Sequence, residues 1–174
     1  MRMALSIVLG LVAVVAVVVL GLYVAGSRLP REHHSQITVT VRANRATVWK
    51  LLTDYRSMPQ WWPAVKAVRM EKLADGTELT WNQDRHGQKI PFRTVESRPT
   101  ERLVRAIATA QLPYGGKWTY ELSETGAGFT RLTLIEDGYI DPPLFRAMAN
   151  WVIGLDRTQR DFIDSLQRQV SRIN

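Results

Sequence analysis

The period of hydrophobic and polar positions changes several times along the chain. Residues Ala4 to Ala25 contain no charged side chain over 22 positions. At about 1.5 Å per residue, a helix of this length extends roughly 33 Å, enough to cross a hydrocarbon core of about 30 Å. The pattern predicts one N-terminal transmembrane helix, with residues 1–25 as a membrane anchor.

A cleaved signal peptide is the alternative for this segment. Val24 and Gly26 suit the −3 and −1 positions of a cleavage site before Ser27. A secretory hydrophobic region usually has about 7 to 15 apolar residues, so the observed length favours an anchor. Arg2 and Arg28 flank the segment on opposite sides, so loop charge does not decide the orientation. A very short N-terminal tail with one arginine is typical of a signal anchor. We therefore expect a single-pass protein of the cell membrane, with its soluble domain outside the cytoplasm.

Residues 26–35 are polar and interrupted by Pro30, which predicts a linker, and residues 36–174 have the length of one domain. The domain begins with an alternating pattern. Ile37, Val39 and Val41 alternate with polar residues, as in a half-buried strand over 36–43. From Ala46 the period becomes helical, with Asn44 as the capping residue, and this helix ends near Asp54.

Between Val65 and Ile140 we predict about six further strands in an antiparallel meander. The expected turns lie at 75–76, 86–87, 98–100, 114–116 and 125–128, where glycine and polar residues gather. Leu103 to Ala108 is apolar on both faces, so its orientation stays open. After Pro142-Pro143, apolar residues recur every three, four or seven positions. They predict one amphipathic helix of about 30 residues, with a bend at Gly154.

These elements predict an α+β fold of the helix-grip type. A curved antiparallel sheet of about seven strands wraps a long C-terminal helix, and one transmembrane helix precedes them. A single helix across a curved sheet tends to leave a gap, and such gaps become ligand cavities when they are wide enough.

Two segments of the chain resemble the START-like or SRPBCC superfamily, which includes polyketide cyclase/dehydrase and lipid-transport proteins. Ile37 to Val65 (ITVTVRANRATVWKLLTDYRSMPQWWPAV) is similar to the superfamily's opening strand, helix and P-x-W-x-P segment. Gly115 to Ile140 is similar to its paired late strands. The resemblance implies a hydrophobic ligand in many members and cyclase or hydrolase chemistry in a few. Asn44-Arg45-Ala46 departs from the usual proline-proline-glutamate turn.

Aromatic and apolar residues supply the candidate ligand site. They are expected to line the space between sheet and C-terminal helix, since aromatic and methionine side chains give large, adaptable contact area. The alternative is that they fill the core completely. The candidates are Trp62, Trp81, Phe92, Trp118, Tyr120, Leu134, Phe145, Met148, Trp151 and Leu155.

Glu136 is the one candidate for acid/base chemistry. Strict alternation places it on the face of Leu132 and Leu134, and a buried carboxylate needs a partner or a raised pKa. A bulge or a frayed strand end would instead turn it to solvent. Arg105 is a candidate partner from a neighbouring strand.

The histidines and the absence of cysteine give no metal or nucleophile motif. His33 and His34 are adjacent, so they point to opposite sides of an extended chain, and we expect them to be linker residues. His86 lies beside Gly87 in an expected turn. The chain also lacks a G-x-S-x-G elbow and a phosphate-binding loop. We expect no metal and no cofactor.

The net charge of +7 is spread over single lysines and arginines without a basic block or a nucleic-acid motif. It fits attraction to anionic lipid headgroups or a solvated surface, and we expect no nucleic-acid partner. The favoured function is binding or transfer of an apolar or amphipathic molecule, such as a lipid, quinone, isoprenoid or polyketide-like compound. Two alternatives stay open: a cyclase/dehydrase-like enzyme using Glu136, and a non-catalytic interaction module without ligand. The oligomeric state stays undetermined.

Overall fold

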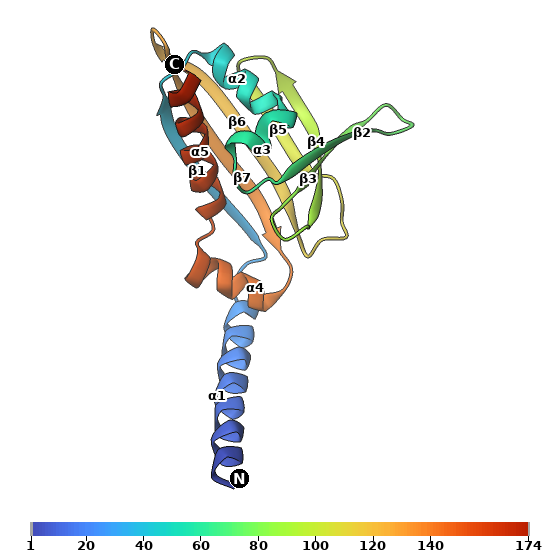
Figure 1. Cartoon of the computed structure of the whole chain (residues 1–174), viewed down its shortest axis with the longest axis vertical. Coiled ribbons are helices and arrows are strands. Elements are labelled where there is room, and N and C mark those ends of the chain that lie inside the picture. The colour runs from blue at the N-terminus through green and yellow to red at the C-terminus, as the bar shows by residue number, and fades with distance from the viewer. Residues whose placement is uncertain (1, 174) are drawn as a thin grey trace.

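The chain forms a curved sheet with helices on one face, carried on a separate N-terminal helix (Figure 1). The computed structural model describes residues 2–173. Met1 and Asn174, the outer ends of the predicted anchor and domain, lie outside the described residues. The predicted α+β helix-grip fold is confirmed.

Seven strands form one sheet in the order β1-β7-β6-β5-β4-β3-β2, with every neighbouring pair antiparallel. The first strand in sequence thus pairs with the last, and the others follow as a meander. The strands are β1 (Glu32–Val41), β2 (Ala67–Lys72), β3 (Glu78–Gln83), β4 (Lys89–Arg98), β5 (Arg102–Ile107), β6 (Tyr114–Gly126) and β7 (Phe129–Ile140).

Helices α2 (Arg45–Thr53), α3 (Met58–Trp61) and α5 (Arg157–Ile173) cover one face of this sheet, which we call the inner face. Asn44 caps α2 as expected, because its side chain accepts a hydrogen bond from the Thr47 amide at 2.8 Å. A short 3₁₀ turn, η1 (Tyr55–Ser57), leads into α3. The core lies between these helices and β1, β5, β6 and β7, and Phe162 of α5 is fully buried in it.

Helix α1 (Arg2–Ser27) extends away from the domain (Figure 1). Its segment Ser6–Ser27 has 22 residues, and an 18-residue stretch of it has a mean hydropathy of 3.0 with no residue buried in the protein. By length and composition this helix can cross a membrane, and a signal sequence near an N-terminus meets the same criteria.

The junction between α1 and the domain is tightly packed. Arg146 of α4 (Pro143–Met148) donates hydrogen bonds to the carbonyls of Gly26, Ile140 and Asp141, at 3.0, 3.2 and 2.8 Å. A Cβ on Gly26 would lie only 1.9 Å from the Pro143 carbonyl oxygen. The end of α1 is therefore held against α4 by a close backbone approach and a buried arginine.

Two predicted boundaries are wrong. Strand β1 begins at Glu32 rather than Gln36, because residues 32–35 pair with Glu136 to Tyr139 of β7. His33 and His34 are thus strand residues, and only Arg28 to Arg31 connects α1 to the sheet. The segment 114–116, expected to be a turn, begins β6. Gly116 serves a close approach between strands, since a Cβ there would meet the Asp137 carbonyl oxygen at 2.4 Å.

The C-terminal helix is not one element of about 30 residues. It is divided into α4, a π-helical turn η2 (Ala149–Ile153) and α5. Gly154 separates η2 from α5 with φ of +89°, a conformation that glycine adopts without the penalty other residues incur. The predicted bend is therefore a complete break, and only α5 lies along the inner face (Figure 1).

Candidate functional site

A cross-strand row on the inner face carries two charged residues, and aromatic side chains lie around it. Arg105 of β5 pairs with Trp118 of β6, which pairs with Glu136 of β7. Residues that pair across antiparallel strands point to the same side of a sheet. With strands about 4.8 Å apart, the backbones carrying the arginine and the glutamate lie roughly 10 Å apart, on either side of Trp118.

Four aromatic rings pack around Phe162 of α5, which covers the inner face. The Phe162 ring lies 5.0 Å from Trp62, 5.6 Å from Trp61, and 5.7 Å from both Trp118 and Tyr120. Most of these contacts are edge-to-face, the geometry that aromatic quadrupoles favour. Phe162 was not among the predicted site residues. Its central place depends on where α5 crosses the sheet.

Arg105 is a buried cation with no carboxylate partner among residues 2–173. Its side chain is about 5% exposed, and its Nε and Nη2 atoms have no hydrogen-bond partner within residues 2–173. The guanidinium carbon lies 4.0 Å from the ring centre of Tyr55 and 5.1 Å from that of Phe92. These cation–π contacts replace part of the lost hydration. Burial lowers the pKa of Arg105 from its usual value, while the nearby Tyr55 and Tyr120 oppose this shift.

Glu136 points to the inner face, as the alternation predicted. One carboxylate oxygen lies 3.5 Å from Nε2 of His33, and the other is buried without a hydrogen-bond partner in the described chain. Arg105 and Glu136 make no ion pair with each other among the contacts of residues 2–173. The sequence did not indicate the His33 contact, because it requires residue 33 to be part of β1.

Three further buried polar atoms on this side have no partner among the described residues. They are the amide oxygen of Asn82 on β3 and the indole nitrogens of Trp61 and Trp62. Asn82 was not among the predicted site residues. Buried polar groups are nearly always hydrogen-bonded in folded proteins, so each of these atoms requires a partner outside residues 2–173, such as an ordered water molecule or a ligand group. The inner face therefore offers donors from Arg105 and the tryptophans, and acceptors from Asn82 and Glu136.

Tyr120 lies on the same face of β6 as Trp118, next to this row, and is buried. Burial strongly raises the pKa of its hydroxyl, and the nearby Arg105 opposes that rise. The phenol stays protonated at physiological pH and is available as a hydrogen-bond donor.

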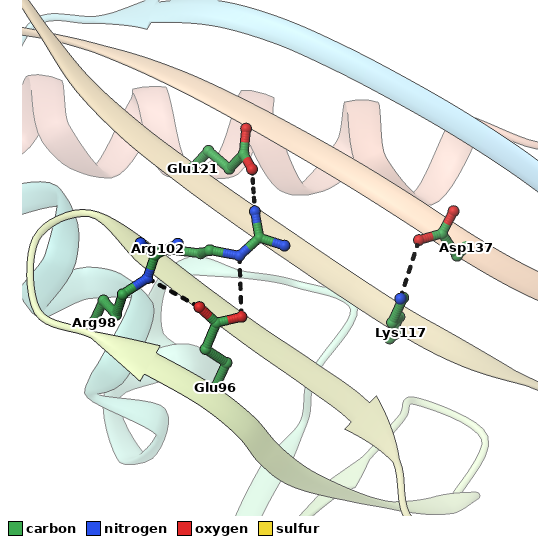
Figure 2. A network of polar contacts seen from close by, with 6 residues as sticks. All are labelled: Glu96, Arg98, Arg102, Lys117, Glu121 and Asp137. Carbon is green, nitrogen blue, oxygen red and sulfur yellow. Dashed lines mark hydrogen bonds and ion pairs between the residues drawn. The ribbon is translucent and has the colours of Figure 1, made fainter.

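The outer face of the same strands carries paired charges instead. Figure 2 shows Arg102 of β5 between Glu96 and Glu121, and Lys117 beside Asp137. Arg98 also contacts Glu96, at 2.9 Å. Every charge in this network has an opposite charge within reach, in contrast to Arg105 on the opposite side of β5.

Trp81 was expected to line the ligand space, and this is wrong. Its neighbours Thr80 and Asn82 are buried on the inner face. Thr80 pairs with Phe92 of β4, and Phe92 pairs with Ile107, which lies on the same side of β5 as Arg105. Trp81 therefore points to the outer face, where its indole nitrogen donates to Glu71 at 2.7 Å. Alternation shows which residues share a face, but the covering helices decide which face is inside.

Phe145, Met148 and Trp151 were also expected at this site, and the structure places them elsewhere. All three are exposed, on α4 and η2, and these elements lie at the foot of the domain beside α1 (Figure 1). Leu155 lies half-buried in the turn before α5. The break at Gly154 removes this segment from the helical face that covers the sheet.

The remaining candidates, Trp62, Phe92, Trp118, Tyr120 and Leu134, lie on the inner face with Arg105 and Glu136. Two surface pockets lie elsewhere. One of about 380 Å³ is lined by α5 residues including Asp164 and Arg168, and one of about 250 Å³ lies near Asn44 and Phe129. Within residues 2–173, no three His, Asp or Glu side chains lie close enough to share a metal ion.

The chain belongs to the family described as polyketide cyclase/dehydrase and lipid transport, whose model matches residues 32–171. It is thus a member of the START-like, or SRPBCC, superfamily that its sequence resembles. No curated protein sequence matches the chain.

Solved structures show the same fold at low sequence identity. A START superfamily protein from Mycobacterium smegmatis is 19% identical, with a TM-score of 0.63 over 82% of this chain and 99% of that one. The Zhui aromatase/cyclase from a Streptomyces species is 16% identical, with a TM-score of 0.66 over 81% of this chain and 94% of that one. At such identities the similarity establishes the fold alone.

Proposed function

We propose that the inner face binds an apolar or amphipathic small molecule with polar oxygen atoms, such as a lipid, quinone, isoprenoid or polyketide-like compound. The observation that carries this proposal is the group of unpartnered polar atoms on Arg105, Glu136 and Asn82 within an aromatic interior. An unpaired buried guanidinium costs several kcal/mol. Ligand oxygen atoms would recover that cost by accepting hydrogen bonds from the guanidinium.

Binding would work by encapsulation. The ligand would enter between α5 and the segment around Trp61 and Trp62, and would lose its water against the sheet. Its apolar part would lie against Trp62, Phe92 and Trp118, and its polar end would face Arg105. Because Phe162 occupies the centre of the aromatic cluster, entry requires α5 to move outward relative to the sheet.

The test is to purify the full chain from its native membrane, extract it with organic solvent and analyse the extract by mass spectrometry. A hydrophobic compound should co-purify with the wild type and be lost from the variant Arg105→Met. The matched control is Arg102→Met, on the same strand but the outer face, which should retain the compound. Equal amounts with all three proteins, or no compound with any, would refute the proposal.

Enzymatic activity of the cyclase/dehydrase type is the second candidate, and the contact between Glu136 and His33 favours it. A carboxylate beside an imidazole can move a proton between substrate atoms. With a poly-β-ketone substrate analogue, Glu136→Gln should abolish cyclised and dehydrated products while binding persists. Unchanged turnover in this variant would remove Glu136 from the mechanism.

The N-terminal helix would tether this site to a membrane, with the domain on the extracytoplasmic side. Tethering would raise the effective concentration of a lipid-derived ligand at the site. The chain has no cysteine, so one introduced at exposed Val95 can report the side. A membrane-impermeant maleimide should label Val95→Cys in intact cells. Labelling only after lysis would place the domain in the cytoplasm.

A further inference from the structure

An apolar surface lies on α4 and η2, the segment that joins the sheet to α5. It consists of exposed large side chains within the nine positions 145–153. Trp151 is 56% exposed and Val152 is 72% exposed. Soluble proteins rarely expose a continuous apolar patch of this kind without a partner. The members of this surface, which we call the foot surface, are Phe145, Met148, Trp151, Val152 and Ile153.

The opposite side of the same segment is fixed to the protein. Ala147 is fully buried, and Arg146 binds the carbonyls of Gly26, Ile140 and Asp141. The apolar residues are therefore not left over from an unfolded or loosely attached segment. The segment is amphipathic, with one side docked on the domain and on α1 and the other side open.

The position of the foot surface along α1 indicates what covers it. Segment α4 contacts the last turn of α1, where Gly26 approaches Pro143, and the apolar span ends at Ser27. The segment crosses the upper end of α1 in Figure 1, and the rest of the domain lies beyond it. When the span occupies a bilayer, α4 and η2 lie at the level where hydrocarbon gives way to headgroups.

The residue types of the foot surface suit that level. Tryptophan is enriched where membrane meets water, and interfacial amphipathic helices bury tryptophan and phenylalanine side chains several ångströms into this boundary. Arg28 follows the span directly and is exposed, so it can meet anionic headgroups. A bilayer thus matches both the apolar and the charged residues at this end of the domain.

We propose that α4 and η2 form a second membrane contact, in which the foot surface inserts into the interfacial region beside α1. This inference rests on the tethering part of the proposed function and is independent of ligand identity. Two contacts, a span and an interfacial segment, would fix the tilt of the domain. They would also hold the Gly154 end of α5 close to the lipid.

The experiment uses the full chain with single cysteines carrying an environment-sensitive fluorophore. The protein is reconstituted in vesicles of phosphatidylcholine and phosphatidylglycerol containing lipids with a nitroxide near the headgroup. Val152→Cys reports the foot surface. Val95→Cys is the matched control, because Val95 is also a valine, 57% exposed, and lies on β4. Val14→Cys, in the middle of α1, reports the span itself.

The label at 152 should show blue-shifted emission and several-fold stronger quenching by the nitroxide lipid than the label at 95. The label at 14 should be shielded from water and quenched most by a nitroxide near the bilayer centre. If 14 is shielded but 152 behaves like 95, the second contact is refuted while the tether stands. If the labels at 14 and 152 are both accessible to water, the membrane tether and the second contact are both refuted.

A second copy of the chain is the other possible cover for the foot surface, and the same samples distinguish it. Self-association would shield position 152 only at high protein-to-lipid ratios, without quenching by the nitroxide lipid. That result would overturn the proposal. Shielding that stays constant as the protein is diluted into lipid would support it.

Discussion

The inner face of the sheet and the junction between α1 and α4 each bury an arginine, with opposite surroundings. Arg146 at the junction is 6% exposed and donates three hydrogen bonds to backbone carbonyls. Arg105 on the inner face is just as buried, yet two of its nitrogen atoms have no partner among the described residues. A buried charge is tolerated when its hydrogen bonds are made and is costly when they are not. The junction is therefore held by hydrogen bonds that are made, whereas the inner face keeps a buried charge whose hydrogen bonds are incomplete.

Removing the junction arginine should have the largest effect. Arg146→Ala leaves three backbone carbonyls without their charged donor, one in a buried and two in part-buried contacts, which should lower the free energy of unfolding by about 3 kcal/mol. Thermal unfolding of the full chain in detergent measures this. Arg172→Ala, an exposed position near the end of α5, should change stability by less than about 0.5 kcal/mol. Equal effects of the two variants would mean that Arg146 does not hold the junction.

The close approach at Gly26 should give the next largest effect. Gly26→Ala places a methyl group against the Pro143 carbonyl, and relieving this clash should cost about 2 kcal/mol. It should also speed amide hydrogen exchange in residues 144–148. Gly21→Ala lies in the same helix with nothing within 4 Å of its added Cβ, so it should leave the junction intact. An unchanged exchange rate in Gly26→Ala would show that α1 and α4 separate easily.

The inner-face arginine should respond in the opposite direction. Arg105→Met removes an unpaired buried charge and keeps similar volume, so the ligand-free protein should gain about 1 to 2 kcal/mol of stability. Chemical denaturation of delipidated protein tests this sign. A loss of stability would mean that the stacking of Arg105 on Tyr55 and Phe92 outweighs the cost of its unpaired nitrogens.

Exposed charges on β1 and β7 should give the smallest effect. A hydrogen bond from His34 is the main cause that lowers the pKa of the Asp137 carboxyl, and Lys117 adds to it. Because the folded-state pKa lies below the unfolded one, the small stabilisation is present at neutral pH and is lost as pH falls through the folded pKa. His34→Ala should raise this pKa more than Lys117→Met does, measured by NMR titration of the carboxyl carbon. The reverse order would contradict the main role of His34.

Part of the candidate site was predictable because strand periodicity is local. The alternation of Trp118, Tyr120 and Leu122, and of Leu132, Leu134 and Glu136, indicated residues that share a face, and the structure places them together on the inner face. The same reasoning failed for Trp81, because β3 turns its polar residues inward. Nothing in the local pattern of β3 shows which side the helices cover.

The segment after Pro143 shows the same limit for helices. Its apolar positions have a helical period, and they were expected to face the sheet along one continuous helix. The π-helical turn and the positive φ of Gly154 interrupt that helix, so residues before the break face outward at the foot of the domain. A single glycine changed which surface these residues belong to.

The sequence by itself determined the apolar span, the order of strands and helices, and the family, because each depends on patterns within short segments or on overall resemblance. Only the tertiary structure decided that Arg146 finds three carbonyl partners while Nε and Nη2 of Arg105 find none among residues 2–173. It also decided that His33 reaches Glu136, and that Phe145 and Trp151 are exposed on α4 and η2. These outcomes depend on which distant segments meet. Long-range strand pairing and packing determine which segments meet, and the local period of hydrophobic residues carries no information about these contacts.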